Sequence, residues 1–391
     1  MENNSVSLPS SNVWKIPRSN AHLFNQQIRE EILQAVQPAL FGDYWDFPKL
    51  LIQFEKQFAE FIGLAHVAAV QSGSSALLLA LRAAGLKAGD EVITVANSDM
   101  STTSSIRHCG ARPVFCDILD SDYTINPDLV ETLITERTTG LLPVDLYGHP
   151  ANMKALQQIA KKHGLFIVED AAIATAARDF GKGMGAFADL VCFSTCSTKQ
   201  IGAIGNGGMV ATDDPDLRER LEVFRGYGLN PETSKTQHAG NDQIADGYNL
   251  KMSPVDAAVL SVKMSYLPAW TERRKQIARH YESRLHGVAG ITLPTFRPES
   301  EPVRREFALC VKQRDQVFIQ LRENGVQTAL NYCPPAHQRK VYQELNLPGS
   351  TNLKQTEQIS REIITLPIDP LLTNEDIDYV CDQLILAVKT S

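Results

Sequence analysis

A single lysine, Lys199, stands in the stretch CFSTCSTKQIGAIGNGGMV (192–210), between hydroxyl and thiol side chains on one side and glycines on the other. Small flanking residues can leave a lysine poorly hydrated, which lowers its pKa and makes its amine a better nucleophile. The glycines permit tight backbone turns beside it. Structural lysines far outnumber catalytic ones, so this stretch alone leaves three interpretations open: a surface charge, a phosphate ligand or a nucleophile.

The segment QSGSSAL (71–77) places Gly73, Ser74 and Ser75 at the start of a predicted helix. Free backbone N–H groups, serine hydroxyls and the positive end of the helix dipole favour a phosphate group at such a position. An ordinary serine cap is the alternative, and this segment alone does not distinguish the two.

The segment IVEDAA (167–172) runs from an apolar strand straight into Glu169 and Asp170. Open α/β sheets bind ligands beyond the carboxyl ends of their strands, where these carboxylates are expected. A buried acid there needs a cation or an N–H donor as its partner. A helix cap or a structural ion pair would meet that need as well as a ligand would.

A phosphate site, a carboxylate and a lysine in this chain order are what pyridoxal 5′-phosphate (PLP) requires. The first holds the phosphate, the acid pairs with the protonated pyridine nitrogen, and the lysine forms a Schiff base. With its nitrogen protonated, the ring accepts the electrons left behind when a Cα proton departs. The sequence lacks the GxxxxGK[ST] order of a P-loop and a GxGxxG that opens a helix, which argues against a dinucleotide cofactor.

The whole chain has the composition of a globular protein of two domains, with 391 residues, 43% of them hydrophobic and 21% charged. Its net charge of −7, from 38 Lys and Arg against 45 Asp and Glu, disfavours a nucleic-acid or anionic-membrane partner. No apolar run approaches the roughly 18 residues that span a bilayer, and the polar N-terminus lacks the apolar core of a secretory signal. Seven cysteines, odd in number and without a CxxC pair, indicate reduced thiols in the cytoplasm and disfavour a metal site.

The elements that would position these groups alternate between strand and helix over about 150 residues, which predicts an open, largely parallel α/β sheet. After residue 210 the pattern changes to that of a smaller α+β domain. The expected strands are 66–70, 89–96, 111–118, 140–148, 165–172 and 305–312. The expected helices are 29–40, 49–63, 101–109, 127–134, 153–164, 217–228, 253–285 with a break near Pro268, 314–325 and 374–389, together with one that ends at Gly85.

From about residue 20 to 385 the chain resembles the DegT/DnrJ/EryC1/StrS family of PLP-dependent sugar aminotransferases, which have fold type I. The resemblance implies an α/β large domain over 21–255, with a mostly parallel seven-stranded sheet between helices, and a smaller C-terminal α+β domain over 256–391. Residues 1–20 would form a flexible arm. The segments that carry the resemblance are SGSSAL, GDEVITV, PVDLYGHPANM, VEDAA, FSTCSTKQIGAIGNGG, GYNLKMSPVDAAV, RDQVFIQLRENGV, NYCPPAHQ and ITLPIDPLLTNEDIDYV.

The resemblance also implies roles for single residues. Lys199 would form the Schiff base and then move the proton between the substrate Cα and the cofactor, and Asp170 would pair with the pyridine nitrogen. Tyr332 and His337 lie in a segment near the substrate opening, although an exposed loop position is the alternative for His337. The other implied cofactor contacts are Gly73, Ser74, Ser75 and Ser194 at the phosphate, Ala172 on one ring face, and Asn249 at the phosphate of the neighbouring subunit.

The implied reaction moves an amino group from L-glutamate to a keto sugar, nucleotide-linked in this family, or to a keto-cyclitol. The implied assembly is a homodimer with shared active sites. A related sugar dehydratase is one alternative, but that branch has a histidine at the position of Lys199. A PLP-binding protein without catalysis is the other.

Two positions depart from the family pattern. By ungapped counting, Asp99 stands where the family places an aromatic residue over the pyridine ring, and a shift by one residue would bring Met100 there instead. Ile173 stands three residues after Asp170, where the family has Gln or His, and it cannot hydrogen-bond the phenolic oxygen of the cofactor. These departures bear on the choice of substrate and on the tuning of the ring, while Lys199 and Asp170 retain the central chemistry.

Overall fold

The computed structural model describes residues 14–43, 46–230, 242–345 and 347–390. Its centre is a seven-stranded sheet in the order β1-β9-β8-β5-β4-β2-β3, in which β9 runs antiparallel to both of its neighbours and the other pairs are parallel. The expected mostly parallel α/β sheet is thereby confirmed. Its strands are β1 (His66–Val70), β2 (Glu91–Val95), β3 (Arg112–Cys116), β4 (Thr138–Leu142), β5 (Phe166–Asp170), β8 (Leu190–Ser194) and β9 (Gly208–Thr212).

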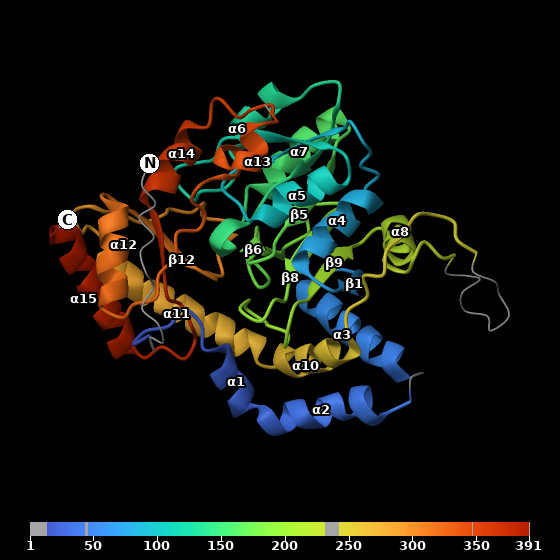
Figure 1. Cartoon of the computed structure of the whole chain (residues 1–391), viewed down its shortest axis with the longest axis horizontal. Coiled ribbons are helices and arrows are strands. Elements are labelled where there is room, and N and C mark those ends of the chain that lie inside the picture. The colour runs from blue at the N-terminus through green and yellow to red at the C-terminus, as the bar shows by residue number, and fades with distance from the viewer. Residues whose placement is uncertain (1–13, 44–45, 231–241, 346, 391) are drawn as a thin grey trace.

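Helices cover both faces of this sheet, which explains why its strands are apolar on both sides. In β8, for example, Leu190 and Cys192 pack into the core on one face, and Val191 and Phe193 into the core on the other. The first face is covered by α4 (Gly73–Ala83), α5 (Met100–His108) and α8 (Pro215–Arg225) (Figure 1). The second is covered by α3 (Phe47–Ile62), α6 (Pro127–Val130), α7 (Met153–His163) and α10 (Pro254–Met264).

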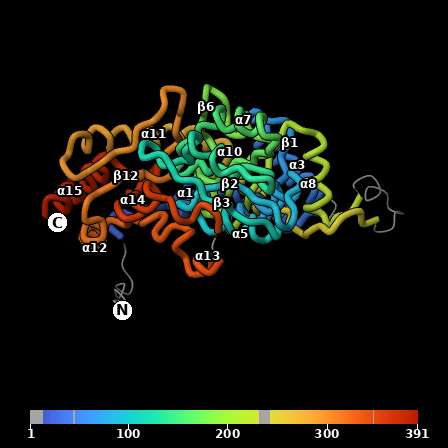
Figure 2. Tube along the Cα trace, turned by 90° about the horizontal axis from the view of Figure 1, so that it is seen from above, coloured from blue at the N-terminus to red at the C-terminus, as the bar shows by residue number. Residues whose placement is uncertain are grey.

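The C-terminal part has a core of its own, around a three-stranded antiparallel sheet in the order β10-β12-β13. Its helices α12 and α15 lie at one end of the molecule, and α3, α8 and β1 at the other (Figure 2). The helical tract 253–285 is broken as expected, because α10 ends at Met264 and Pro268 lies in the first turn of α11. The elements are α11 (Leu267–Leu285), β10 (Ile291–Thr292), β12 (Phe307–Val311), α12 (Arg314–Glu323), α13 (Lys340–Gln343), α14 (Lys354–Glu362), β13 (Ile363–Leu366) and α15 (Asn374–Thr390).

The remaining elements connect these parts. The two N-terminal helices are α1 (Ala21–Gln27) and α2 (Arg29–Phe41), and α2 lies beside α10 (Figure 1). A small sheet pairs β11 (Ser300–Glu301) with β6 (Arg178–Asp179), which in turn pairs with β7 (Lys182–Gly183). Single 3₁₀ turns occur at Glu131–Leu133, Leu146–Gly148 and Ala336–Gln338.

Part of the expected N-terminal arm, residues 1–13, lies outside the described residues. The following segment is held against the C-terminal part, because Ile16 exchanges backbone hydrogen bonds with Gly325 and Gln327 and is 1% exposed in the C-terminal core. The division of the chain at residue 255 stays a prediction. The helix after it, α10, packs with α2 and α3, and the residues that enter the C-terminal core begin at Ile277 in the middle of α11.

Two elements end four or more residues earlier than the sequence pattern predicts. The strand expected over 140–148 stops at Leu142, before Pro143, which has no N–H group to donate to a neighbouring strand. The chain then makes a 3₁₀ turn in which Tyr147 has a φ of 60°. The helix expected over 127–134 is one α-helical turn, α6, followed by a 3₁₀ turn.

The direction of the strands determines where the candidate residues meet. Parallel strands β1, β2, β5 and β8 all end at the same edge of the sheet. Directly after their carboxyl ends come Ser72 to Ser75, Asp99, Asp170 and the loop that carries Lys199. This edge is the place where open α/β sheets bind ligands.

Candidate active site

Asp170 lies at the carboxyl end of β5 and is 3% exposed. Its Oδ2 accepts a hydrogen bond from the Thr102 hydroxyl at 2.9 Å, and its Oδ1 accepts one from the Ala172 N–H at 3.3 Å. Burial raises the pKa of this carboxyl to about 6, while the two hydrogen bonds and the charge of Lys199 oppose the rise. The structure thus places an acid that is costly to ionise at the sheet edge, where a cationic ligand group would stabilise its charge.

Lys199 lies in the turn between β8 and β9, where its N–H donates to the Cys196 carbonyl at 2.8 Å. Burial lowers the pKa of its amine, and the neighbouring Arg305 guanidinium lowers it further. Three acids act in the opposite direction: Glu306, Asp170 and Asp99. The net effect brings the amine closer to its neutral, nucleophilic form, as the sequence predicts for a catalytic lysine.

The start of α4 lies against the end of β8, as the expected phosphate site requires. A Cβ atom added to Gly73 would lie 2.8 Å from the Ser194 Cβ, so the two chain segments are in direct contact only because residue 73 is a glycine. The helix is capped by Ser72, whose hydroxyl oxygen accepts from the Ser75 N–H at 3.0 Å. The backbone N–H groups of Gly73 and Ser74 in the first turn have no intrahelical acceptor and can bind an anion.

The serine cap at QSGSSAL does not exclude a phosphate site there, which stays a prediction. The serine cap is present, but it is made by Ser72 and not by Ser74 or Ser75. The hydroxyl of Ser75 is shared with that of Ser72 at 2.9 Å. Ser74 at the helix start and Ser194 at the strand end remain the serines best placed to meet a phosphate.

These residues fit PLP. Among the described residues, Lys199 is the cation that acts on the buried Asp170 carboxyl, and a protonated ring nitrogen would supply a second one. The helix N-terminus at Gly73 and Ser74 is the type of site that binds a phosphate. Lys199 supplies an amine of lowered pKa at the same edge of the sheet. A lysine, a buried acid and a phosphate site in this arrangement define the class of PLP-dependent enzymes.

Asp99 does not take up the role of a ring that stacks on the cofactor. It caps α5, where its Oδ1 accepts from the N–H of Ser101 at 2.9 Å and from the hydroxyl of Ser101 at 2.6 Å. Its charge nevertheless acts on the site, because its Coulomb interaction shifts the pKa of both Asp170 and Lys199 upward, against the larger effect of burial on Lys199. Met100, the alternative occupant, is 62% exposed.

Ile173 is buried in the apolar core that also contains Val144 and Tyr147. Its carbonyl accepts a hydrogen bond from the Gln200 side-chain amide at 2.5 Å. An isoleucine therefore fits the packing at this position. The hydrogen bond to its backbone carbonyl comes from Gln200, the residue after Lys199.

The remaining candidate residues are spread over several places. Asn249 is exposed, and its carbonyl accepts from the Gln71 side chain at 2.7 Å, directly before the phosphate site. Tyr332 lies among the acids of the site: burial raises the pKa of its hydroxyl, and Glu306, Asp99 and Asp170 add to the rise.

His337 differs from the expectation of an exposed loop residue, since it is 7% exposed. Its Nε2 lies 3.2 Å from the Glu357 Oε1, and its ring packs near that of Phe115 at 6.3 Å. These contacts attach the segment 336–338 to the large sheet. The burial of His337 is therefore explained by the packing of the C-terminal part against the large sheet.

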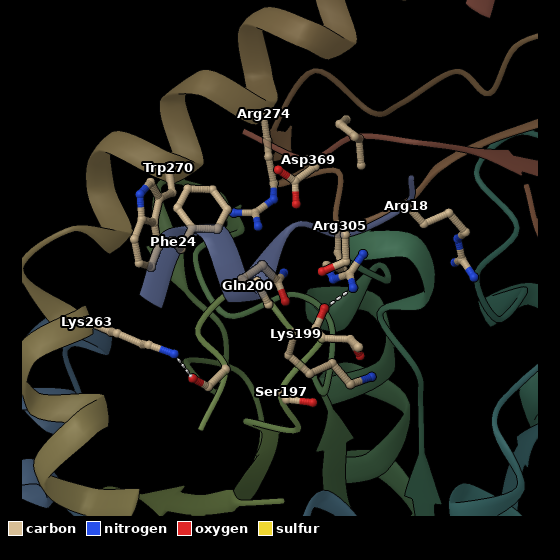
Figure 3. Close-up of a pocket in the computed structure, with 15 residues that line it drawn as sticks. Arg18, Phe24, Ser197, Lys199, Gln200, Lys263, Trp270, Arg274, Arg305 and Asp369 are labelled. Atoms are coloured by element: carbon tan, nitrogen blue, oxygen red, sulfur yellow. Dashed lines mark hydrogen bonds between the residues drawn. The ribbon is translucent and has the colours of Figure 1, made fainter. Parts of the chain in front are cut away.

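Sequence reasoning missed several residues that act on the site. Thr102, which donates to Asp170, lies on the first turn of α5, three residues after the departure at Asp99. Arg305 donates to the carbonyl of Thr198, one residue before Lys199 (Figure 3). No local pattern marks this arginine, because it comes from the bend before β12, more than 100 residues away in the chain.

A pair of buried acids also lies behind Asp170. Asp145 and Glu169 are hydrogen-bonding neighbours, and each has one oxygen without a donor other than the partner acid. Burial raises the pKa of Glu169 to about 7, and burial together with Glu169 raises the pKa of Asp145 well above its usual range. One shared proton satisfies both, with Asp145 donating to Glu169.

The described residues contain no group of three or more His, Cys, Asp and Glu side chains arranged to hold a metal ion. None of their helices is long and apolar enough to cross a membrane.

Comparison with known proteins places the chain in a family. A model of the DegT/DnrJ/EryC1/StrS aminotransferase family matches residues 26–385, and the chain belongs to this family. The protein is accordingly a PLP-dependent aminotransferase. The resemblance inferred from the sequence motifs is confirmed.

Two curated relatives match over nearly their whole length. The erythromycin biosynthesis sensory transduction protein EryC1 of Saccharopolyspora erythraea is 38% identical over 358 residues, 92% of this chain and 95% of the relative. The dTDP-3-amino-3,4,6-trideoxy-alpha-D-glucose transaminase of Streptomyces venezuelae is 36% identical over 370 residues, 95% of each chain.

Solved structures agree with the fold. The crystal structure of S. venezuelae DesV in complex with a ketimine intermediate superposes with a TM-score of 0.88 at 34% identity, covering 96% of this chain and 98% of that one. The structure of NtdA from Bacillus subtilis with bound cofactor PMP superposes with a TM-score of 0.85 at 28% identity, covering 98% and 87%.

Proposed function

We propose that this protein transfers an amino group from L-glutamate to a keto sugar, in nucleotide-linked form, or to a keto-cyclitol. The observation that carries the proposal is the pairing of a lysine of lowered pKa, Lys199, with a buried strand-end acid, Asp170. Support for the sugar comes from the relatives, among them transaminases whose names specify dTDP-linked amino sugars.

Each residue has a task in this proposal. Lys199 would hold PLP through its Nζ and would accept the proton that leaves the donor Cα. Asp170 would keep the pyridine nitrogen protonated, and Thr102 orients the Asp170 carboxylate. When bound, PLP would supply an acceptor for the electrons of the breaking Cα–H bond. Gly73, Ser74, Ser75 and Ser194 would hold the phosphate, and Ala172 would pack on one ring face.

The substrate contacts are part of the same proposal. Tyr332 lies among the acids around Lys199 and is the better placed of the two substrate candidates. His337 would act through the packing of its segment, because its own contacts are with Glu357 and Phe115.

The proposed assembly is a cytoplasmic homodimer in which Asn249 reaches the phosphate of the neighbouring subunit. Large apolar side chains on α2 and α3 support such an assembly: Phe41 of α2 is 84% exposed and Ile52 of α3 is 62% exposed. Ile52 also lines a hollow of about 1300 Å³, in which apolar and charged side chains are mixed. Exposed apolar side chains that lie together are typical of a protein interface.

The two alternatives make different predictions. A dehydratase would eliminate water from the sugar and leave glutamate unchanged. A PLP-binding protein without catalysis is supported only by the departures at Asp99 and Ile173, which the structure accounts for by capping and packing.

The test is a coupled assay for 2-oxoglutarate with L-glutamate and a panel of nucleotide-linked keto sugars. We expect 2-oxoglutarate and an amino sugar in equal amounts from the native protein and none from Lys199→Ala. Lys161→Ala, which removes an exposed lysine of α7, serves as the control and should retain the activity. Sugar turnover without 2-oxoglutarate would contradict the proposal and favour the dehydratase.

A further inference from the structure

A cavity lies beside the turn that carries Lys199 (Figure 3). Its walls come from the N-terminal segment at residues 18–24, the turn at residues 197–202 and helix α11, together with Lys263 of α10, Arg305, Ile368 and Asp369. The aromatic rings of Phe24 and Trp270, whose centroids are 4.7 Å apart, form one side.

Arg274 of α11 points into this cavity and is 6% exposed. Its guanidinium makes no hydrogen bond or ion pair with any of the described residues, and its Nη1 is buried without an acceptor. Burial lowers the pKa of this arginine to about 9, and the like charge of Arg305 adds to the effect. An unpaired buried guanidinium costs several kcal/mol, so an anionic partner is expected at this point.

The charges around the cavity do not supply that partner. Among the described residues that line the cavity, Asp369 is the only acid, and its oxygens accept from the backbone N–H groups of Asn20 at 2.8 Å and Leu371 at 3.1 Å. Its Coulomb attraction offsets only part of the cost of burying Arg274. The basic lining residues are Arg18, Lys199, Lys263, Arg274 and Arg305.

Arg305 supplies a second group directed at the same space. Its Nη2 donates to the Thr198 carbonyl, but its Nε is buried without an acceptor. Two guanidinium groups with unused N–H donors are a common way to bind an oxyanion.

The size of the cavity suits a small ion. Its volume of about 30 Å³ exceeds the roughly 10–15 Å³ that one water molecule requires. Gln200 also lines it with a buried Oε1 that lacks a donor, which a water or a protonated oxyanion would provide.

We propose that this cavity binds a small oxyanion, a carboxylate or a phosphate-type ion, between Arg274 and Arg305. The bound anion accepts from the Nη1 of Arg274 and the Nε of Arg305. Because Arg305 also holds the carbonyl of Thr198, occupancy of the cavity fixes the turn that presents Lys199. The proposed site shares no lining residue with the phosphate site at Gly73, Ser74 and Ser194.

The proposal is tested by calorimetric titration of the PLP-loaded protein with sodium sulfate and, separately, with sodium acetate. The buffer is zwitterionic and contains no phosphate or added chloride. We expect saturable binding that weakens about 10- to 100-fold in Arg274→Met, the loss typical of one charge-assisted hydrogen bond. Arg279→Gln, an exposed arginine of the same helix paired with Glu272, is the control and should bind as the native protein does.

Arg305→Gln provides a second variant, because Arg305 is partly exposed and lies outside α11. It should weaken binding in the same direction as Arg274→Met. If Arg274→Met fails to fold, Arg305→Gln decides the outcome. Absence of saturable binding, or equal affinities in the native protein and in both variants, overturns the proposal.

Two further observations locate the bound anion and distinguish a phosphate-type ion from a carboxylate. Crystals of the holoprotein soaked in selenate should show an anomalous peak between Arg274 and Arg305. A peak found only at Gly73 and Ser74 would contradict the proposed site. Sulfate binding without acetate binding identifies the natural ligand as a phosphate-type ion, and comparable binding of both identifies it as a carboxylate.

Discussion

Replacing Asp170 with asparagine is expected to stabilise the cofactor-free protein and to weaken its affinity for PLP. In the native fold, burial raises the pKa of Asp170 from its ordinary value of 3.8 to about 6. A folded-state pKa above the unfolded one means that the folded protein loses stability as the pH rises between these values. Asparagine has no charge to bury, so the variant avoids this loss.

The size of the effect follows from the two pKa values. Their difference, at about 1.4 kcal/mol for each pKa unit, corresponds to about 3 kcal/mol once the pH is well above 6. The same relation gives about 1.6 kcal/mol at pH 5 and about 0.5 kcal/mol at pH 4. An amide that lacks an acceptor for its NH₂ group adds an opposing cost of about 1–3 kcal/mol, but that cost does not change with pH.

The measurement is urea unfolding of the cofactor-free native protein and of Asp170→Asn at pH 4, 5 and 8. The free energy of unfolding of the variant should gain about 2.5 kcal/mol on the native protein between pH 4 and pH 8. Asp128→Asn, at an exposed position, is the control and should show no such trend. A difference between variant and native protein that is independent of pH would refute the assignment of a raised pKa to Asp170.

The other predictions concern the surroundings of the site. Gly73→Ala brings a Cβ to 2.8 Å from the Ser194 Cβ and should weaken PLP binding, measured by equilibrium dialysis. The double variant Gly73→Ala with Ser194→Gly should regain part of the lost affinity, and no recovery would mean that this contact is not the cause. Asp99→Ala should lower the free energy of unfolding by about 0.5–2 kcal/mol through loss of the α5 cap, and Asp99→Asn should retain it; equal losses would contradict the capping role. Glu169→Gln should gain stability relative to the native protein as the pH rises from about 4.5 to 7, because the raised pKa of Glu169 beside Asp145 makes its ionisation costly. If the difference in free energy of unfolding, measured in urea, stays unchanged across this range, Glu169 is not the acid that titrates.

Much of the central sheet was predictable because its signals are local. Apolar runs such as those at 66–70 and 165–172 predict buried strands, and the alternation with helices predicts parallel pairing. Lys199 and Asp170 follow such runs, so the edge of the sheet at which they meet could be inferred as well. Pro143 shortened one predicted strand, and this could have been read from the sequence, because a proline cannot donate in a central strand.

The contacts between distant segments could not be inferred in this way. His337 was expected on an exposed loop, but it is buried because Glu357 and Phe115 approach it from elsewhere in the chain. Arg274 belongs to a helix with many charged residues, where nothing in the local pattern indicates that its side chain is buried without a partner. Such features depend on tertiary packing, which a periodic pattern does not describe.

The central claim is that Lys199 and Asp170 form the site of a working aminotransferase. The most direct test is the absorbance spectrum of the purified protein with PLP, recorded before and after addition of L-glutamate. The account predicts a visible band of lysine-bound cofactor that converts to the pyridoxamine form with glutamate and is absent from Lys199→Ala. A band that persists unchanged in the presence of glutamate and other amino acids would contradict it.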